Sequence, residues 1–180
     1  MRLIPADAAV RSAPGVRWAM AGIALAVLAA DQVSKSLVLA ARPSGVTGTG
    51  WVSVRLVRNT GASGSLASGY PVLVTLAAVA VTAVAVVIGF RARSHGVALC
   101  IAAVVGGAAG NLADRLFRAP GLGRGGVVDW IHFASGGGSL DLADLAIQFG
   151  VAGAVIALVA EGRGRRVRES REPGQVSEGS

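Results

Sequence analysis

The stretch Gly106-Gly107-Ala108-Ala109-Gly110-Asn111-Leu112-Ala113-Asp114-Arg115 begins as small residues inside an apolar run and ends in polar ones. Amide and charged groups at membrane depth are costly and usually mark a functional site. Asn111, Asp114 and Arg115 are spaced three and four residues apart, so on a helix they lie on one face. The first and last glycines of the stretch form a small-xxx-small pair, which lets a second helix approach closely. A simpler interpretation is that this face only packs against another helix and that the polar residues cap the helix end. The positions of the other acidic residues distinguish this interpretation from a functional site.

The composition is that of a membrane protein. Of 180 residues, 53% are apolar and 15% charged, and the mean hydropathy is +0.61. A soluble domain carries about a quarter charged residues. The net charge of +7 does not indicate nucleic-acid binding, because the arginines cluster at the ends of apolar runs, as topology signals do. Cys100 is the single cysteine, so no intrachain disulfide is expected.

Four apolar runs are long enough to cross a bilayer. They lie at residues 18–41, 71–90, 96–117 and 142–160. The first run continues past Asp31 with no small-x-small cleavage site before it, so it is interpreted as a retained helix and not a signal peptide. We therefore expect an all-α integral membrane protein with a single four-helix domain over residues 18–160. Residues 1–17 form a cytoplasmic segment, and residues 161–180 a charged, disordered tail.

The polar segments between the runs are rich in glycine. Val52, Val54 and Leu56 alternate with polar residues, which predicts a short amphipathic strand. We expect a small extracytoplasmic β-rich segment between the first two helices, resting on the bilayer surface and shaping a cleft. Residues 118–140 are expected to form a loop.

Arginine counts predict the orientation. Residues 1–17, 91–95 and 161–180 carry three, two and five arginines, ten in all, whereas residues 42–69 and 118–140 carry five. The positive-inside rule then places both termini in the cytoplasm. The acidic residues that remain fall at the outer membrane–water boundary, on four separate segments: Asp31, Asp114, Asp129, Asp141 and Asp144.

Carboxylates gathered in this way suggest hydrolysis. When two are close together, one keeps its proton, and the pair can act as base and acid on a water molecule. Asp129 and Asp144 share a depth, but the sequence does not show that they touch. Asp31 and Lys35 are four apart and can pair, either as a structural ion pair or facing a substrate.

Two other chemistries fit part of this pattern. Carboxylates with Asn59 and Asn111 would suit a hard cation. No metal motif of defined spacing is present and His95 is on the opposite side, so neither a metal nor a cofactor is expected. Gly61-Ala62-Ser63-Gly64 matches the nucleophile motif of rhomboid serine proteases, but its base would have to be His132, in a loop, and four spans fall short of the rhomboid core of six.

Five motifs in order make the chain resemble the lipoprotein signal peptidases, the signal peptidase II type of bacterial membrane aspartic protease. They are Asp31-Gln32-Val33-Ser34-Lys35, Asn59-Thr60-Gly61-Ala62, the stretch from Gly106 to Arg115, Val127-Val128-Asp129-Trp130, and Leu142-Ala143-Asp144-Leu145-Ala146-Ile147. The resemblance covers residues 18–160. It departs at Gly64, where the family usually has an aromatic residue, and at Asp141, where it usually has Asn.

The resemblance implies a catalytic dyad of Asp129 and Asp144. The residues expected to bind or position the substrate are Asp31, Lys35, Asn59, Gly61, Asn111, Asp114, Arg115 and Asp141. The expected reaction is removal of the signal peptide from a prolipoprotein, before a diacylglyceryl-modified cysteine. The partners would be that precursor and membrane lipid, with no nucleic acid, and the protein would be a monomer in the bacterial inner membrane with its active site facing outward. The alternatives are a catalytically impaired family member and a small proton-coupled carrier that uses the carboxylates as a relay.

Overall fold

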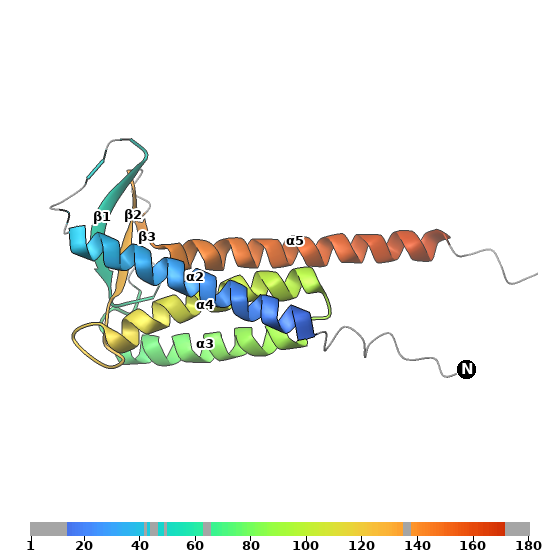
Figure 1. The fold of residues 1–180 in the computed structure, drawn as a ribbon, viewed down its shortest axis with the longest axis horizontal. Coiled ribbons are helices and arrows are strands. Elements are labelled where there is room, and N and C mark those ends of the chain that lie inside the picture. The colour runs from blue at the N-terminus through green and yellow to red at the C-terminus, as the bar shows by residue number, and fades with distance from the viewer. Residues whose placement is uncertain are drawn as a thin grey trace, which may run out of the picture.

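The computed structural model describes residues 14–41, 43, 47–48, 50–62, 66–134 and 138–171, with side chains as far as residue 164. Its helices are α2 (Pro14–Ala41), α3 (Pro71–Arg91), α4 (His95–Phe117) and α5 (Leu142–Arg171). Its strands are β1 (Val52–Asn59), β2 (Val127–Phe133) and β3 (Ser139–Leu140). The helices run side by side, and the sheet crosses one end of the bundle (Figure 1).

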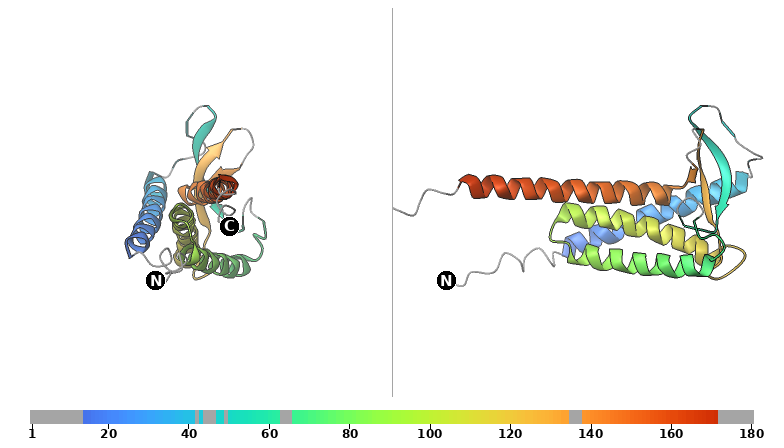
Figure 2. Two further views of the ribbon diagram at one scale, coloured as in Figure 1. Left: turned by 90° about the vertical axis from the view of Figure 1, so that its right-hand side faces the viewer. Right: turned by 180° about the vertical axis from the view of Figure 1, so that it is seen from behind.

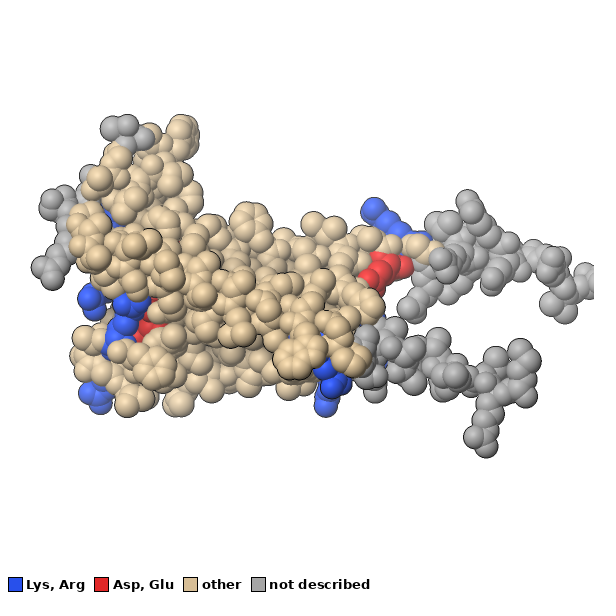
Figure 3. Space-filling model, in the orientation of Figure 1, with Lys and Arg blue, Asp and Glu red and all other residues tan. Residues whose placement is uncertain are grey.

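The helices match the predicted spans. Within the described residues, four are long and apolar enough to cross a membrane: Pro14–Ala41, Pro71–Arg91, His95–Phe117 and Leu142–Gly164. On the face drawn in Figure 3, charged side chains gather at the two ends of the bundle and the middle shows none. The expected fold class, an all-α multi-pass membrane protein, is confirmed.

Two boundaries differ from those expected. Helix α2 begins at Pro14, because proline suits the first helical turn. Helix α5 continues to Arg171, so the prediction of a disordered tail from residue 161 is wrong for its first part. Residues 161–171 are rich in arginine and glutamate, which favour helix when they extend an existing one. In Figure 1 and in the right-hand view of Figure 2, α5 extends beyond the other helices at the end where the chain begins. The rest of the predicted tail and residues 1–13 lie outside the described residues.

Helix α4 is the centre of the bundle, since it packs against α2, α3 and α5. A Cβ atom on Gly106 would lie 2.6 Å from the carbonyl oxygen of Ala24 in α2, and one on Gly107 would lie 2.5 Å from that of Ala143 in α5. Gly110 leaves room in the same way for the carboxylate of Asp31, which would meet a Cβ atom at 2.5 Å. The predicted close approach of a second helix is confirmed, and it brings polar groups of α2 and α5 against the end of α4.

The sheet is antiparallel in the order β1-β2-β3. Strand β1 was expected, but the prediction that residues 118–140 form a loop is wrong, because β2 and β3 lie there. The start of β2 is buried on both faces at Val127, Val128 and Asp129, so the strand lacks the alternation that marks β1. The register pairs Val57 with Asp129, beyond an irregularity in β1.

Candidate active site

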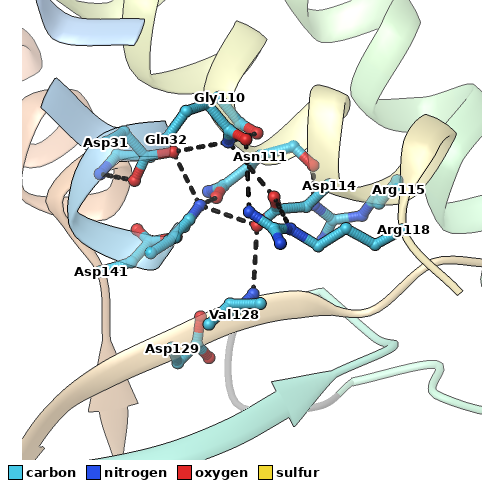
Figure 4. Close-up of polar contacts among 12 residues, drawn as sticks. Asp31, Gln32, Gly110, Asn111, Asp114, Arg115, Arg118, Val128, Asp129 and Asp141 are labelled. Atoms are coloured by element: carbon cyan, nitrogen blue, oxygen red, sulfur yellow. Dashed lines mark hydrogen bonds and ion pairs between the residues drawn. The ribbon is translucent and has the colours of Figure 1, made fainter. Parts of the chain in front are cut away.

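A buried polar cluster lies where the end of α4 meets α2, the sheet and the start of α5 (Figure 4). Four of its charged side chains are completely buried: Asp31, Lys35, Asp114 and Asp141. Arg115 and Asp129 are buried as well. All the predicted site residues from these four segments therefore converge, as their shared depth predicted.

Lys35 is the centre of the cluster. Its Nζ atom lies 2.8 Å from Oδ2 of Asp31, 2.9 Å from Oδ2 of Asp114 and 2.6 Å from Oδ2 of Asp141. It also donates a hydrogen bond to Oδ1 of Asn111 at 3.1 Å. The expected pair with Asp31 is confirmed. Lys35 is completely buried and is surrounded by three carboxylates, so the geometry is that of a structural ion-pair network.

Two of these carboxylates cap helix α5. Oδ1 of Asp31 accepts a hydrogen bond from the backbone N–H of Ala143 at 3.1 Å, and Oδ1 of Asp141 accepts one from Asp144 at 2.7 Å. Carboxylates at a helix start satisfy free N–H groups and complement the helix dipole. The other oxygen of Asp141 is held by Lys35.

Asn111 connects Lys35 to Asp144. Its side-chain oxygen accepts from the ammonium, and its Nδ2 donates to Oδ1 of Asp144 at 3.0 Å. The lysine fixes which way round the amide lies, so the amide presents a donor to the carboxylate. Asn111 thereby holds an oxygen of Asp144 in place.

Asp114 holds the sheet against α4. Its Oδ2 accepts from the backbone N–H of Val128 at 3.1 Å, and its Oδ1 accepts from Nε of Arg118 at 2.5 Å and from Gln32 at 3.2 Å. The bond to Val128 fixes the strand next to Asp129. Gln32 and Arg118 were missed as site residues. Arg118 follows Asp114 by four residues, a spacing that predicts contact on a helix. Gln32 reaches Asp114 from another helix, and no spacing in the sequence signals that contact.

The loop after β1 supports the other side of the site. Nδ2 of Asn59 lies 3.4 Å from Oδ2 of Asp129, its diagonal neighbour across the sheet, and its Oδ1 accepts from the backbone N–H of Gly61 at 3.0 Å. Arg115 donates to the backbone oxygens of Gly61 at 2.9 Å and Asn111 at 3.1 Å. Arg115 therefore ties this loop to α4, and its role in binding or positioning the substrate stays a prediction.

Asp129, Asp141 and Asp144 bring carboxylate oxygens within 4.8 Å of one another. Burial, together with the nearby charges of Asp141 and Asp144, raises the pKa of Asp129 to about 7. Burial also raises the pKa of Asp141 to about 6, against the opposing effect of Lys35. One proton is thus readily kept within the group at neutral pH, which is the condition for an acid–base pair. Carboxylate oxygens are also good ligands for hard cations. Whether a metal ion binds to this cluster therefore has to be tested.

A cavity of about 640 Å³ adjoins these carboxylates. Its polar end is lined by Asn59, Asn111, Arg115, Asp129 and Asp144. The remainder is mostly apolar and lies between one face of α3, from Leu73 to Thr82, and the start of α5. Asp129 lines this cavity, and its Oδ1 is buried and accepts no hydrogen bond from the described residues.

The serine-protease alternative receives no support from His132. Its Nδ1 lies 3.2 Å from Oγ of Ser139, across the pair of strands β2 and β3. Ser63, the nucleophile that this alternative needs, and the departure at Gly64 lie outside the described residues.

Comparison with known families gives a direct match. The family model for signal peptidase (SPase) II matches residues 23–160, most of the chain and all of the site. The chain belongs to the signal peptidase II family. The predicted resemblance is confirmed, and the four spans and the buried cluster are features of a member of this family.

Proteins named lipoprotein signal peptidase are among the relatives. The one from Rhodococcus jostii is 49% identical over 113 residues, 61% of this chain and 57% of that protein. The one from Streptomyces griseus is 38% identical over 81% of this chain and 76% of its own length, and the one from Leifsonia xyli is 34% identical over 91% and 77%. The alignment thus spans little more than half of the first relative and about three quarters of the others.

Two solved structures described as bacterial membrane enzymes share the fold. One has a TM-score of 0.67 at 21% identity and covers 89% of this chain and 94% of its own. The other has a TM-score of 0.64 at 23% identity and covers 77% and 91%. At these identities the likeness concerns the fold alone.

Proposed function

We propose that this chain is a lipoprotein signal peptidase of the aspartic type, which removes the signal peptide before a diacylglyceryl-modified cysteine. Membership of the signal peptidase II family supports the activity. The observation that supports the catalytic type is the approach of the Asp129 and Asp144 carboxylates to within 4.8 Å beside an apolar cavity.

The two carboxylates differ in their surroundings, which assigns their roles. Asp144 is held as an acceptor by Nδ2 of Asn111, so we infer that it is ionised and takes a proton from the attacking water. Asp129 has the raised pKa of about 7 and a free oxygen, so it carries the proton and donates a hydrogen bond to the carbonyl of the scissile peptide. Water oxygen bonds to the carbonyl carbon, and the proton held by Asp144 passes to the leaving nitrogen as the C–N bond breaks. The products are a carboxylic acid, whose proton then passes to the released amine to give a carboxylate and an ammonium group, and both aspartates return to their starting forms.

The cavity suits the proposed substrate. A signal peptide is an apolar helix that lies in the bilayer, and the lining of α3 offers it Leu73, Val74, Ala77 and Val81. Leu73 and Val81 are more than half exposed on the outer surface of the bundle. A helix can therefore enter from the lipid between α3 and α5 and bring its outer end to the carboxylates.

The test of this function is cleavage by the purified protein. A precursor carrying a diacylglyceryl-modified cysteine should be cut on the amino side of that residue, as read by mass spectrometry of both fragments. The same precursor without the lipid serves as the control and should be cut far more slowly. Equal cleavage of both, or none of either, would contradict the proposed substrate.

The orientation predicts a labelling pattern. We expect both termini in the cytoplasm and the sheet outside, because arginines are concentrated at the opposite end of the bundle. In a Cys100→Ala background, a cysteine at the exposed position Leu122 should react with a membrane-impermeant thiol reagent in intact cells. A cysteine at Gly162, where the added side chain meets no other group, should react only after lysis. Reaction of both in intact cells, or only of Gly162, would rule out this orientation.

Asp141→Asn is expected to move the alkaline limb of the pH–rate profile to lower pH. The charge of Asp141 is one of the causes that hold the pKa of Asp129 at about 7, so its removal lowers that pKa and Asp129 loses its proton earlier as the pH rises. The measurement is kcat/KM on the lipidated precursor across pH. The control is His132→Gln, which removes the imidazole from the same strand and should leave the limb unmoved. A limb that stays in place in Asp141→Asn would show that Asp141 does not influence the acid.

A further inference from the structure

One polar side chain in the cavity has no part in the mechanism above. Gln148 lies on α5 four residues after Asp144 and lines the same cavity. It is the single polar residue of α5 between Asp144 and Glu161. Most other residues that α3 and α5 contribute to the lining are apolar, among them Ile147, Ala78 and Val81.

Within the described residues, the amide of Gln148 makes no hydrogen bond to the protein. Thr82, the other polar residue in this part of the lining, already donates its hydroxyl to the backbone oxygen of Ala78 at 2.7 Å. Gln148 is exposed on the outer surface of the bundle. An amide side chain that faces lipid has no water to bond to, so such a residue is expected to have a function.

The substrate of the proposed function has backbone carbonyls that lack a hydrogen-bond donor. A helix ends with four backbone carbonyls that no N–H of the same helix satisfies. For hydrolysis, the scissile peptide bond has to lie at the carboxylates, outside the helical part of the signal peptide. The four unsatisfied carbonyls therefore lie in the last helical turn before the scissile bond. In lipid they have no water to bond to. A rise of 1.5 Å per residue places Gln148 about 6 Å along α5 from Asp144, roughly one helical turn into the membrane.

We propose that Gln148 is a positioning residue that donates a hydrogen bond from its side-chain amide to a backbone carbonyl in the last turn of the bound signal helix. This rests on the proposed function. The contact recognises main chain, so it fits signal peptides of different sequence. It holds the end of the helix at a fixed distance from Asp144, and thereby sets which peptide bond reaches the catalytic pair.

The test compares Gln148→Leu with Phe149→Leu, a neighbouring change at a residue that is 74% exposed and outside the cavity lining. Gln148→Leu should raise KM for the lipidated precursor by about tenfold or more and leave kcat nearly unchanged, because a carbonyl left unpaired in lipid weakens binding. Phe149→Leu should keep the KM of the unaltered protein, and both should melt at its temperature. Gln148→Ala, which leaves the neighbouring side chains undisturbed, should repeat the result.

Substrates with one backbone amide replaced by an ester identify the carbonyl, since an ester oxygen is a weaker acceptor. Placed in turn along the four peptide bonds before the cleavage site, the ester should impair binding to the unaltered protein at one position and have no added effect there on Gln148→Leu. An unchanged KM in Gln148→Leu and Gln148→Ala, or equal ester effects in both proteins, would overturn the role of Gln148 alone. Failure of the unaltered protein to cut the lipidated precursor would overturn the proposed function and this inference together.

Discussion

Replacing Asp129 by asparagine is expected to lower kcat by about 10²–10⁴-fold, the usual contribution of a positioned acid or base. The amide keeps the shape of the side chain and can still meet Asn59, but it cannot pass a proton. Asp144→Asn should cause a loss of the same order, because the water then has no acceptor for its proton. The rate is to be measured under single-turnover conditions with the lipidated precursor, so that product release does not hide the change.

The matched control is Glu161→Gln. It makes the same change of carboxylate to amide on α5, at the opposite end of the bundle, where Glu161 contacts Ser94. This variant should cleave at the normal rate. If Asp129→Asn cleaves within a few-fold of the unaltered protein while remaining folded, the assignment of Asp129 as the acid is wrong.

Lys35→Met is expected to destabilise the fold severely. The change removes the ammonium that lies within 3 Å of the carboxylates of Asp31, Asp114 and Asp141, all of them fully buried. Removing one partner of a buried ion pair typically costs about 3–5 kcal/mol. That is a large part of the roughly 5–15 kcal/mol by which proteins are stable. We expect a large fall in melting temperature in detergent, or loss of the folded protein.

Two comparisons make this prediction specific to charge. Arg55→Met removes an exposed cation from β1 and should change the stability by no more than about 0.5 kcal/mol. The double change Lys35→Met with Asp141→Asn leaves one uncompensated carboxylate fewer, so it should recover part of the lost stability. If Lys35→Met melts like Arg55→Met, the buried network does not hold the site together.

The helices could be predicted because each is a long apolar run, and apolar length alone decides whether a helix spans. The end of α5 could not be predicted in this way. The apolar run stops before Glu161, but the helix continues through the charged residues that follow. The sequence of strand β1 shows the alternation of a strand, although Val52 is exposed and Ser53 is buried. Strand β2 begins in the buried cluster, where both faces are covered, so its sequence carries no such pattern.

For the site, the sequence predicted which residues share a depth, and the motif resemblance suggested which are catalytic. The sequence did not predict which of these side chains form hydrogen bonds or ion pairs with one another. The bond from Asn111 to Asp144 and the pair of Lys35 with Asp141 depend on how α2 and α5 cross α4. Those crossings depend on the close approach of α2 at Gly106 and of α5 at Gly107. The spacing of small residues predicts that a helix can approach, but it does not predict the angle at which the two helices cross. Gln32 was overlooked because its role appears only once Gly110 and Asp114 are placed beside it.

The central claim is that Asp129 and Asp144 activate water without a metal ion, and removal of metals tests it most directly. The purified protein should be treated with a chelator, freed of it, and given the diacylglyceryl-modified precursor in metal-free buffer. The account predicts an unchanged single-turnover rate and the same cut before the modified cysteine, also after exposure to serine-directed reagents. Loss of cleavage on chelation with recovery on adding a divalent cation would contradict it, and would make the cluster of Asp129, Asp141 and Asp144 a metal site.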